Sequence, residues 1–578
     1  MKKLIIIIFT VILALPACDV LDIKPTNMIS EQDVKNDPIL LDAYLTNVYN
    51  SVRWQSGGRS NNMAVLAVCG GEMNVFAGWQ GPYRTAMTII DENGAPGLLD
   101  YWPYGNIRST NEIIQILQNS DTGFDEEFVQ QKSAEARFLR AFMYFELVKR
   151  YGGIPLITEP QSIDQPIEEL YVKRAPEAEV YDFIANEMDD ISRILPSSYG
   201  TDDFGRATKW AALALKSRAM LYAASIAQFS DITLPEGVVG IPQSKAQDYW
   251  QAAYDASMEI INESPHALYN HNPDPQKNYA EIFVKDGNEE VIFAEVYNLS
   301  LLKTHSWNFL YMPDGFRTGW GSNGPIYLEF VEKYEYENGS PGNLNWNDLN
   351  GNVLFDIDSI MADRDPRFRA SIFYPETPWQ GSVVYFHSKT VGTIDSESGW
   401  PSKAPARNYK KSGFLLRKRI NEYVKLPISM EDETDWIVFR MGEIYLNAAE
   451  AAFYLNKSGE SLDLLNAIRE RAGMPDKTEV TEEIIRNERT VELAFEEHHY
   501  WDLRRWRTAV QELNGKGFHG VSWVYNFPEH KYTMKLKSGE YGDVRTFQEK
   551  HYYLPLGIDR LADNPNLVEN PGYTNGGE

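Results

Sequence analysis

Apolar residues recur at helical spacing in two long segments of the first half of the chain. Over residues 134–151, large apolar side chains fall three or four positions apart and line one helix face. Gly152 and Gly153 end this pattern, as glycines commonly do at the C-terminus of a helix. A second helix is expected from about Ala207, and its many alanines would let a neighbouring backbone approach closely. These patterns predict a mainly α-helical protein built from packed helical hairpins.

The spacing of small and large residues indicates hairpins of the tetratricopeptide kind. Such repeats, of about 34 residues, place small residues and a large one at fixed positions of paired helices. Ala246, Trp250 and Ala253 keep the rhythm of the second helix of a repeat. A longer match near Tyr445 consists of Ala449, Ser461, Leu465 and Ile468 at the expected spacings, with Gly459 in the turn. Each match alone also fits an ordinary amphipathic helix, whereas several together favour a tetratricopeptide-like scaffold.

Two regions lack this periodicity. Over residues 231–436, Pro, Gly, Asn and aromatic residues interrupt every regular segment, so we expect loops with short strands at 290–296 and 383–387. Residues 54–104 are also rich in loops, and they lie between a helix at 40–52 and one that starts near Asn106. Long ordered loops in a compact protein usually carry function.

The amino terminus is typical of a bacterial lipoprotein. Two lysines precede an apolar run at 4–15, and Ala17 stands directly before Cys18. About 12 apolar residues are too few for a bilayer span, which needs roughly 20, so we expect cleavage and acylation of Cys18. Pro16 replaces the small or hydroxyl residue usual at its position. The alternative is an ordinary cleaved signal.

Composition and net charge limit the kinds of partner that the protein can bind and indicate what stabilises its fold. The net charge of the 578 residues is −27 and becomes more negative when the signal lysines are removed, which excludes nucleic acid and anionic membrane surfaces as partners. Cys69 is the only cysteine besides Cys18, so no intrachain disulfide is expected once Cys18 is acylated. No Pro/Ser-rich linker divides the chain, which predicts one large body.

Motifs spread over the whole chain resemble those of a single family. They are EARFLRA at 135–141, YGGIPL at 151–156, RMGEIYLNAAE at 440–450, ERTVELAFE at 488–496, WDLRRW at 501–506 and the closing Asn570-Pro571-Gly572-Tyr573. Through them, and through Cys18, the chain resembles the SusD/RagB family of outer-membrane nutrient-binding lipoproteins. Glu497, His499 and the pair Leu556-Gly557 depart from the usual family pattern.

The resemblance implies a domain organisation and a role. It implies a signal peptide at 1–17, an N-terminal SusD-like region at 18–230 and a C-terminal region at 231–578, with loops at 265–436, helices at 437–508 and a tail. The protein would be lipid-anchored at the outer membrane and exposed at the cell surface. It would capture oligosaccharides, or peptides in some branches, and deliver them to a SusC-like TonB-dependent transporter. The helical repeats would face the transporter, and the loops would hold the ligand.

Aromatic residues in the loops are the candidates for sugar contact. With 14 Trp and 33 Tyr, the chain is rich in flat apolar rings that can cover the C–H face of a sugar while polar side chains bind its hydroxyls. Trp79 and Trp320 are the strongest candidates, since family members draw site aromatics from these two loop regions. The other predicted ligand contacts are Arg59, Asn74, Tyr83 and Arg84 in the first region and Trp307, Tyr311, Arg317 and Asn323 in the second. Trp102 and Tyr104 rank behind them.

An enzyme is not expected. His498 and His499 follow two glutamates, but consecutive residues point to different helix faces and the His-Glu-x-x-His order of metalloproteases is absent. No nucleophile elbow or phosphate-binding loop is present either. An extracellular glycoside hydrolase or esterase remains the alternative outside the family, without positive support.

No cofactor is expected, with one possible exception. Asp348, Asn350 and Asn352, followed by Asp356, place oxygen ligands at alternate positions, as calcium loops do. The bidentate glutamate of a true EF-hand is missing. An Asn/Asp-rich turn is the alternative that the composition favours over a structural calcium.

Overall fold

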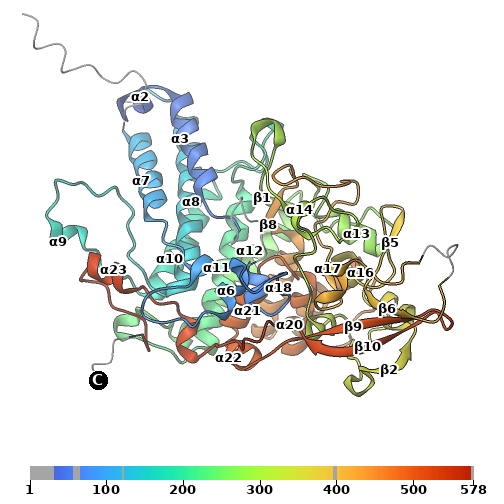
Figure 1. The fold of residues 1–578 in the computed structure, drawn as a ribbon. Helices are drawn as coiled ribbons and strands as arrows, with labels where there is room; N and C mark the ends of the chain where they lie inside the picture. Colours follow the sequence, from blue (N-terminus) through green and yellow to red (C-terminus); the bar gives the residue numbers. More distant parts are fainter. Residues whose placement is uncertain (1–30, 56–64, 120–122, 395–399, 574–578) are drawn as a thin grey trace, which may run out of the picture.

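The computed structural model describes residues 31–55, 65–119, 123–394 and 400–573. Long helices fill one side of the molecule, and short strands and loops fill the other (Figure 1). Cys18 and Arg59 lie outside the described residues, so the predicted acylation site and one predicted ligand contact stay predictions. Within the described ranges, no helix is both long and apolar enough to cross a membrane.

The long helices form one continuous array. They are α3 (Pro38–Ser51), α7 (Tyr104–Gln118), α8 (Glu126–Tyr151), α10 (Glu177–Ile191), α11 (Lys209–Phe229), α12 (Ala246–Glu263), α18 (Met441–Tyr454) and α19 (Ser458–Arg471). Each helix packs against the next, and α12 is followed in space by α18 although the whole loop-rich region separates them in sequence. This arrangement confirms the predicted scaffold of helical hairpins.

Helix α8 shows how the sequence sets the ends of an element. Asp125 accepts a hydrogen bond from the backbone N–H of Phe128 at 2.8 Å and caps the start. Gly152 ends the helix with a φ of +74°, in the left-handed region that glycine tolerates best. The helix begins before the predicted residue 134, because its first two turns are largely polar and exposed and therefore carry no apolar periodicity.

Small polar residues join three helices of the array. Ser217 of α11 and Ser257 of α12 lie with their hydroxyl oxygens 2.8 Å apart, and Asn447 of α18 donates to Ser217 at 3.0 Å. All three side chains are fully buried. Side chains this small let the backbones approach, as the alanine content of α11 predicts. Helix α11 starts after its N-cap Thr208, close to the predicted position.

The tetratricopeptide positions behave as the repeat requires. Ser461 donates to the carbonyl of Ala449 at 2.7 Å, and the Trp250 ring stacks on Tyr454 with centroids 4.5 Å apart. The remaining residues of the pattern are buried as well: Ala246, Ala253, Leu465 and Ile468. Gly459 is an exception, because it is the second residue of α19 and not part of the preceding turn. The first turn of a helix tolerates glycine there, since its N–H groups have no intrahelical partner.

Short helices connect and cover the array. They are α2 (Glu31–Asn36), α5 (Val65–Cys69), α6 (Gly81–Met87), α9 (Ile167–Leu170), α13 (Pro275–Glu281), α14 (Trp307–Tyr311), α15 (Leu328–Val331), α16 (Pro366–Ser371), α17 (Ala406–Lys410), α20 (Glu482–Glu492), α21 (His499–Arg505), α22 (Ala509–Leu513) and α23 (Ile558–Asp563). Helices α5 and α6 lie within the region 54–104, so that region is less irregular than predicted. Cys69, at the end of α5, is a buried free thiol.

The strands lie on the loop-rich side (Figure 1). Two-stranded antiparallel pairs are β1 (Val291–Glu295) with β8 (Trp436–Arg440), β3 (Ile372–Phe373) with β7 (Leu415–Leu416), and β4 (Thr377–Trp379) with β5 (Ser382–Val384). A four-stranded sheet has the order β2 (Asn350–Phe355), β10 (Lys531–Ser538), β9 (His519–Asn526) and β6 (His387–Val391), with β6 parallel to β9. The strand predicted at 290–296 is β1. The strand predicted at 383–387 is instead split between the ends of β5 and β6, which pair with different partners.

Buried ion pairs hold the strand pair β1/β8 against the last helices. Arg440 forms ion pairs of 2.7 Å with both Glu290 and Glu492, and Arg471 binds the same two carboxylates. These side chains are at most 2% exposed. Removing one partner of a buried pair leaves an uncompensated charge and costs about 3–5 kcal/mol. The motif residues Arg440 and Glu492 are therefore structural.

The closing motif packs onto the end of α8. Asn570 donates to the carbonyls of Tyr151 and Leu554 at 3.0 and 2.7 Å, and it accepts from Arg174 at 2.8 Å. Tyr573 donates from its hydroxyl to backbone carbonyls at 3.1 Å. The two family motifs at residue 151 and residue 570 thus meet in space.

Candidate ligand-binding site

The two predicted ligand loops lie side by side. Met73 and Ile326 form an antiparallel bridge, and the backbone N–H of Asn74 donates to the carbonyl of Pro325 at 2.8 Å. Below the surface, the side-chain amide of Gln80 donates to Asn323 at 3.3 Å. Gln80 follows Trp79, and Asn323 comes three residues after Trp320. The fold therefore brings together two regions that are far apart in sequence.

Trp79 and Trp320 are the exposed aromatic residues of these loops. Their side chains are 69% and 64% exposed, respectively. Around Trp320 the backbone folds tightly: a Cβ at Gly319 would come within 2.6 Å of the Phe309 ring, and one at Gly321 within 2.4 Å of the Met312 carbonyl. The loop can pack this closely only with glycine on both sides, and Trp320 is left in solvent.

The other aromatic candidates lie beneath the surface. The Tyr83 hydroxyl donates to Asp543 at 2.9 Å, and burial raises the pKa of Tyr83 to about 12. The Trp307 indole donates to the carbonyl of Lys418 at 3.1 Å, and its ring packs against Tyr311 at 4.5 Å between centroids. All three aromatic side chains are buried. They support the loops from below.

The polar candidates also include both buried and exposed residues. Asn74 and Asn323 are buried, and their amides donate to the carbonyls of Gly539 and Leu310, respectively. Arg84 is exposed on α6. Arg317 forms an ion pair of 2.7 Å with Asp314 at the edge of the Trp320 loop.

Further residues beside the loops gave no signal in the sequence. Arg407 lies with its guanidinium carbon 4.1 Å from the centre of the half-buried Phe76 ring and donates to the carbonyl of Gly321 at 3.1 Å. The Lys411 ammonium lies 3.9 Å from the centre of the Tyr541 ring. Burial, and to a lesser extent the neighbouring Lys410, lowers the pKa of Lys411 to about 8. Arg407 and Lys411 are far from both Trp79 and Trp320 in sequence, so only the fold identifies them.

The calcium candidates do not surround a common point as a loop. Asn350 and Asn352 are exposed residues of strand β2. The side-chain oxygens of Asn350 and Asp356 accept hydrogen bonds from the backbone two residues ahead, at 2.8 and 3.1 Å. Asp348 accepts from Asn345 at 3.0 Å. These contacts are those of an Asn/Asp-rich turn. In the described parts of the chain, no group of three or more His, Cys, Asp or Glu could hold a metal ion.

The histidine pair is neutral. Burial lowers the pKa of His498 well below its ordinary value, and the neighbouring Arg218 acts in the same direction. Burial also lowers the pKa of His499 to about 4. Neither imidazole carries a second proton at neutral pH, so neither is charged to act as a general acid.

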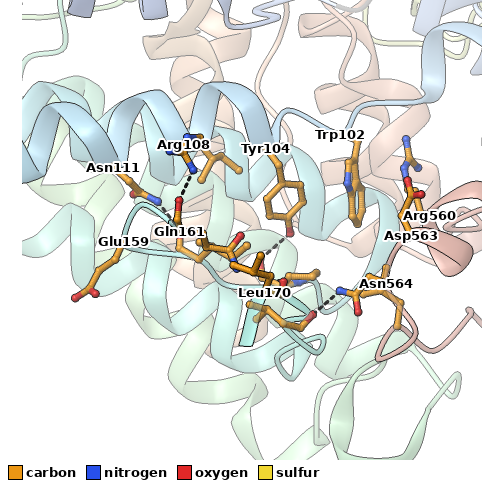
Figure 2. A pocket seen from close by; sticks show the side chains of 15 residues that line it. Trp102, Tyr104, Arg108, Asn111, Glu159, Gln161, Leu170, Arg560, Asp563 and Asn564 are labelled. Carbon is orange, nitrogen blue, oxygen red and sulfur yellow. Dashed lines mark hydrogen bonds between the residues drawn. The ribbon is translucent and has the colours of Figure 1, made fainter. Parts of the chain in front are cut away.

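The second-ranked aromatics belong to a different place. Trp102 and Tyr104 line a cavity of about 480 Å³ between α7, the segment that carries α9, and α23 (Figure 2). None of the residues that line this cavity lies within 74–84 or 307–323, the stretches that carry the other predicted ligand contacts among the described residues. The predicted aromatic candidates thus fall into two separate surfaces.

Two family profiles match the chain. The profile of the SusD family matches residues 289–573, and a profile described as starch-binding and associating with the outer membrane matches residues 19–221. The chain belongs to the SusD family. Within it, a SusD-like protein of Formosa agariphila is 24% identical over 548 residues, which cover 90% of this chain and 83% of that protein. The starch-binding protein SusD of Bacteroides thetaiotaomicron is 23% identical over 501 residues, or 82% and 78% of the two chains.

Solved structures of SusD-like proteins share the fold. The crystal structure of a SusD-like protein from Bacteroides fragilis superposes with a TM-score of 0.73 at 24% identity and covers 95% of this chain and 100% of that one. A laminarin-binding SusD-like protein superposes with a TM-score of 0.62 at 22% identity, covering 92% and 99%. Two of these four proteins, the starch-binding and the laminarin-binding one, are named for carbohydrate binding.

Proposed function

We propose that this protein binds oligosaccharides at the cell surface through Trp79 and Trp320 and delivers them, unaltered, to a TonB-dependent outer-membrane transporter. The observation that carries the proposal is the exposure of two tryptophans on loops that the fold ties together. Single exposed apolar residues are normal on protein surfaces, so the support comes from two exposed tryptophans on neighbouring loops. Rigid loops beneath them, fixed by Gln80 and Asn323, present both rings without a change of backbone.

The chemistry of the surface suits a sugar. An indole face covers the C–H groups of a sugar ring, and the hydroxyls of the sugar need polar partners at its edge. Arg84, Arg317 and Lys411 provide such groups around the two rings. Starch-binding and laminarin-binding relatives support carbohydrate over peptide as the ligand.

Delivery requires an anchor and a partner. We assign the anchor to acyl chains on Cys18, and the partner to a SusC-like transporter contacted by the helical array. The outer-membrane association given for the matching family profile supports this location. Replacing Cys18 by Ser should abolish incorporation of labelled palmitate and release the protein from the membrane fraction.

Calorimetry of the soluble form tests the ligand class. The protein without residues 1–18 is titrated with a panel of oligosaccharides and, in parallel, with peptides of similar size. Heat from an oligosaccharide alone supports the proposal. Heat from peptides alone would assign the protein to the peptide-binding branch, and shortened products after prolonged incubation would identify a hydrolase instead.

Co-purification tests the partner. A SusC-like transporter from the same organism, when expressed with this protein, should copurify with it in detergent and should release or transport the bound oligosaccharide. Absence of this complex would remove the delivery step while leaving sugar binding intact.

A further inference from the structure

The cavity lined by Trp102 and Tyr104 is built from three segments that are far apart in sequence. They are the start of α7, the segment 155–172 that carries α9, and α23 with the chain that follows it (Figure 2). In Figure 1, α9 and α23 lie at the opposite end of the molecule from the four-stranded sheet. No residue that lines the cavity lies within 74–84 or 307–323, so this surface is distinct from the proposed sugar site.

Hydrogen bonds fix the walls of the cavity. The Tyr104 hydroxyl donates to the carbonyl of Pro155 at 2.6 Å, and Asn111 donates to the carbonyl of Ile157 at 3.0 Å. On the other side, Asn564 donates to the carbonyl of Val172 at 2.9 Å. Each bond ties the segment 155–172 to a neighbouring wall. The cavity is therefore preformed, as ligand sites usually are.

Apolar residues make up about half of the lining. Besides the two aromatic rings, the apolar lining residues are Ile107, Pro155, Ile157, Leu170, Val172 and Leu567. Next to these in the chain stand Ile163, Ile167 and Val568, which are 95%, 55% and 57% exposed. Contiguous apolar side chains in solvent around a hollow mark an interaction surface.

Unpaired charge on the lining and walls of the cavity is acidic, because the cations there already have carboxylate partners. The two arginines of the lining are already paired, Arg108 with Glu112 at 2.8 Å and Arg560 with Asp100 at 2.8 Å. Two exposed carboxylates that form no ion pair with any described residue, Glu159 and Asp563, line the cavity, and the segments that form its walls carry four more: Asp164, Glu168, Glu169 and Asp559. Their field attracts cations and repels anions over about 8 Å at physiological salt.

We propose that this cavity is the docking site for a basic segment of a partner protein, which inserts a large apolar side chain between Trp102 and Leu170 while its lysines or arginines meet the surrounding carboxylates. A sugar fits less well, because the Arg560 guanidinium already covers one face of the Trp102 ring at 4.5 Å. An anionic lipid surface is disfavoured by the acidic rim. The proposal does not depend on sugar binding by Trp79 and Trp320.

A short peptide tests the chemistry directly. The probe is a rhodamine-labelled, amidated pentapeptide Lys-Lys-Trp-Lys-Lys, and binding to the soluble protein is followed by fluorescence anisotropy. Two peptides with the same label serve as controls, one with Gly in place of Trp and one with Glu in place of every Lys. We expect the probe to bind about tenfold more tightly than either control, from burial of the indole and from the charge contacts. Affinity should fall as salt is raised.

Charge reversal on the protein locates the site. The double variant Asp563→Lys with Glu159→Lys changes two exposed side chains that line the cavity, so the fold should be kept. It should weaken the basic peptide about tenfold and strengthen the acidic one. The matched control, Asp476→Lys with Glu529→Lys, makes the same charge change at exposed positions that do not line the cavity and should have a much smaller effect.

Three results would overturn the proposal. One is equal binding of all three peptides by the unaltered protein. Another is an equal loss of peptide affinity in the two double variants, because net charge alone would then explain the loss. The third is cavity-dependent binding to vesicles of phosphatidylcholine and phosphatidylglycerol without binding of the peptide, which would make a lipid surface the occupant. Sugar affinity, measured on the same samples, should stay unchanged and so keeps this outcome separate from the proposed function.

Discussion

Replacing either exposed tryptophan should weaken sugar binding by a predictable amount. A tryptophan side chain presents about 250 Å². At 69% exposure, Trp79 leaves roughly 170 Å² in solvent, of which a sugar ring stacked on one face removes about half. At about 25 cal/mol per Å², the roughly 85 Å² lost in Trp79→Ala correspond to about 2 kcal/mol, or a thirtyfold rise in Kd. Trp320→Ala, at 64% exposure, should cost nearly as much.

Calorimetry with the oligosaccharide identified in the panel measures the effect, and thermal unfolding monitors the fold. Both variants should unfold within about 0.5 kcal/mol of the parent protein, because the lost rings pack against little. Trp346→Ala is the matched control. Its ring is 37% exposed and its indole donates to Glu332 at 2.9 Å, away from the two loops, so sugar affinity should not change. Parent-like affinity in both Trp79→Ala and Trp320→Ala would refute the assignment of the site.

Three other substitutions examine the structure around the site. Burial raises the pKa of Glu72 from 4.5 to about 8, so the folded protein retains a proton that the unfolded chain releases, and stability should fall as the pH rises from about 4.5 to about 8. Glu72→Gln should remove this dependence of the unfolding free energy on pH, which amounts to up to roughly 5 kcal/mol. Urea unfolding at several pH values measures it, and an unchanged pH dependence would show that another group causes it. Trp307→Ala should destabilise the protein by about 3–5 kcal/mol in the same assay, because the buried indole leaves a void; a loss of sugar affinity without loss of stability would instead indicate direct contact. Asp348→Asn should leave the Tm unchanged with and without a chelator, whereas a chelator-sensitive Tm in the parent alone would establish a calcium site.

Periodicity predicts the scaffold well because local pattern and burial agree along its helices. In α11 and α18, small residues at fixed spacing meet small residues of the next helix, as at Ser217 and Asn447. The small residues that make these contacts therefore determine which positions of the two helices meet. Polar helix ends lack such a pattern of spaced residues, which is why the first turns of α8 were not predicted.

The local sequence does not predict which loop side chains are exposed to solvent. Trp307 and Trp320 occur in similar sequence surroundings, yet one is buried and the other is in solvent. The difference comes from Lys418 and Trp436, which cover Trp307 and lie more than a hundred residues along the chain. The same holds for Arg407, which reaches Phe76 across the fold. Local sequence predicts the regions of the site, whereas tertiary contacts determine which side chains in those regions are buried and which are exposed.

The contact between Asn570 and the end of α8 makes folding depend on completion of the chain. A chain emerges with its amino terminus first, so α8 is present long before its last turn can receive Asn570. Until then the carbonyls of Tyr151 and Leu554 lack this buried donor. The closing motif thus fastens a late segment of the chain onto the end of an early helix through buried hydrogen bonds.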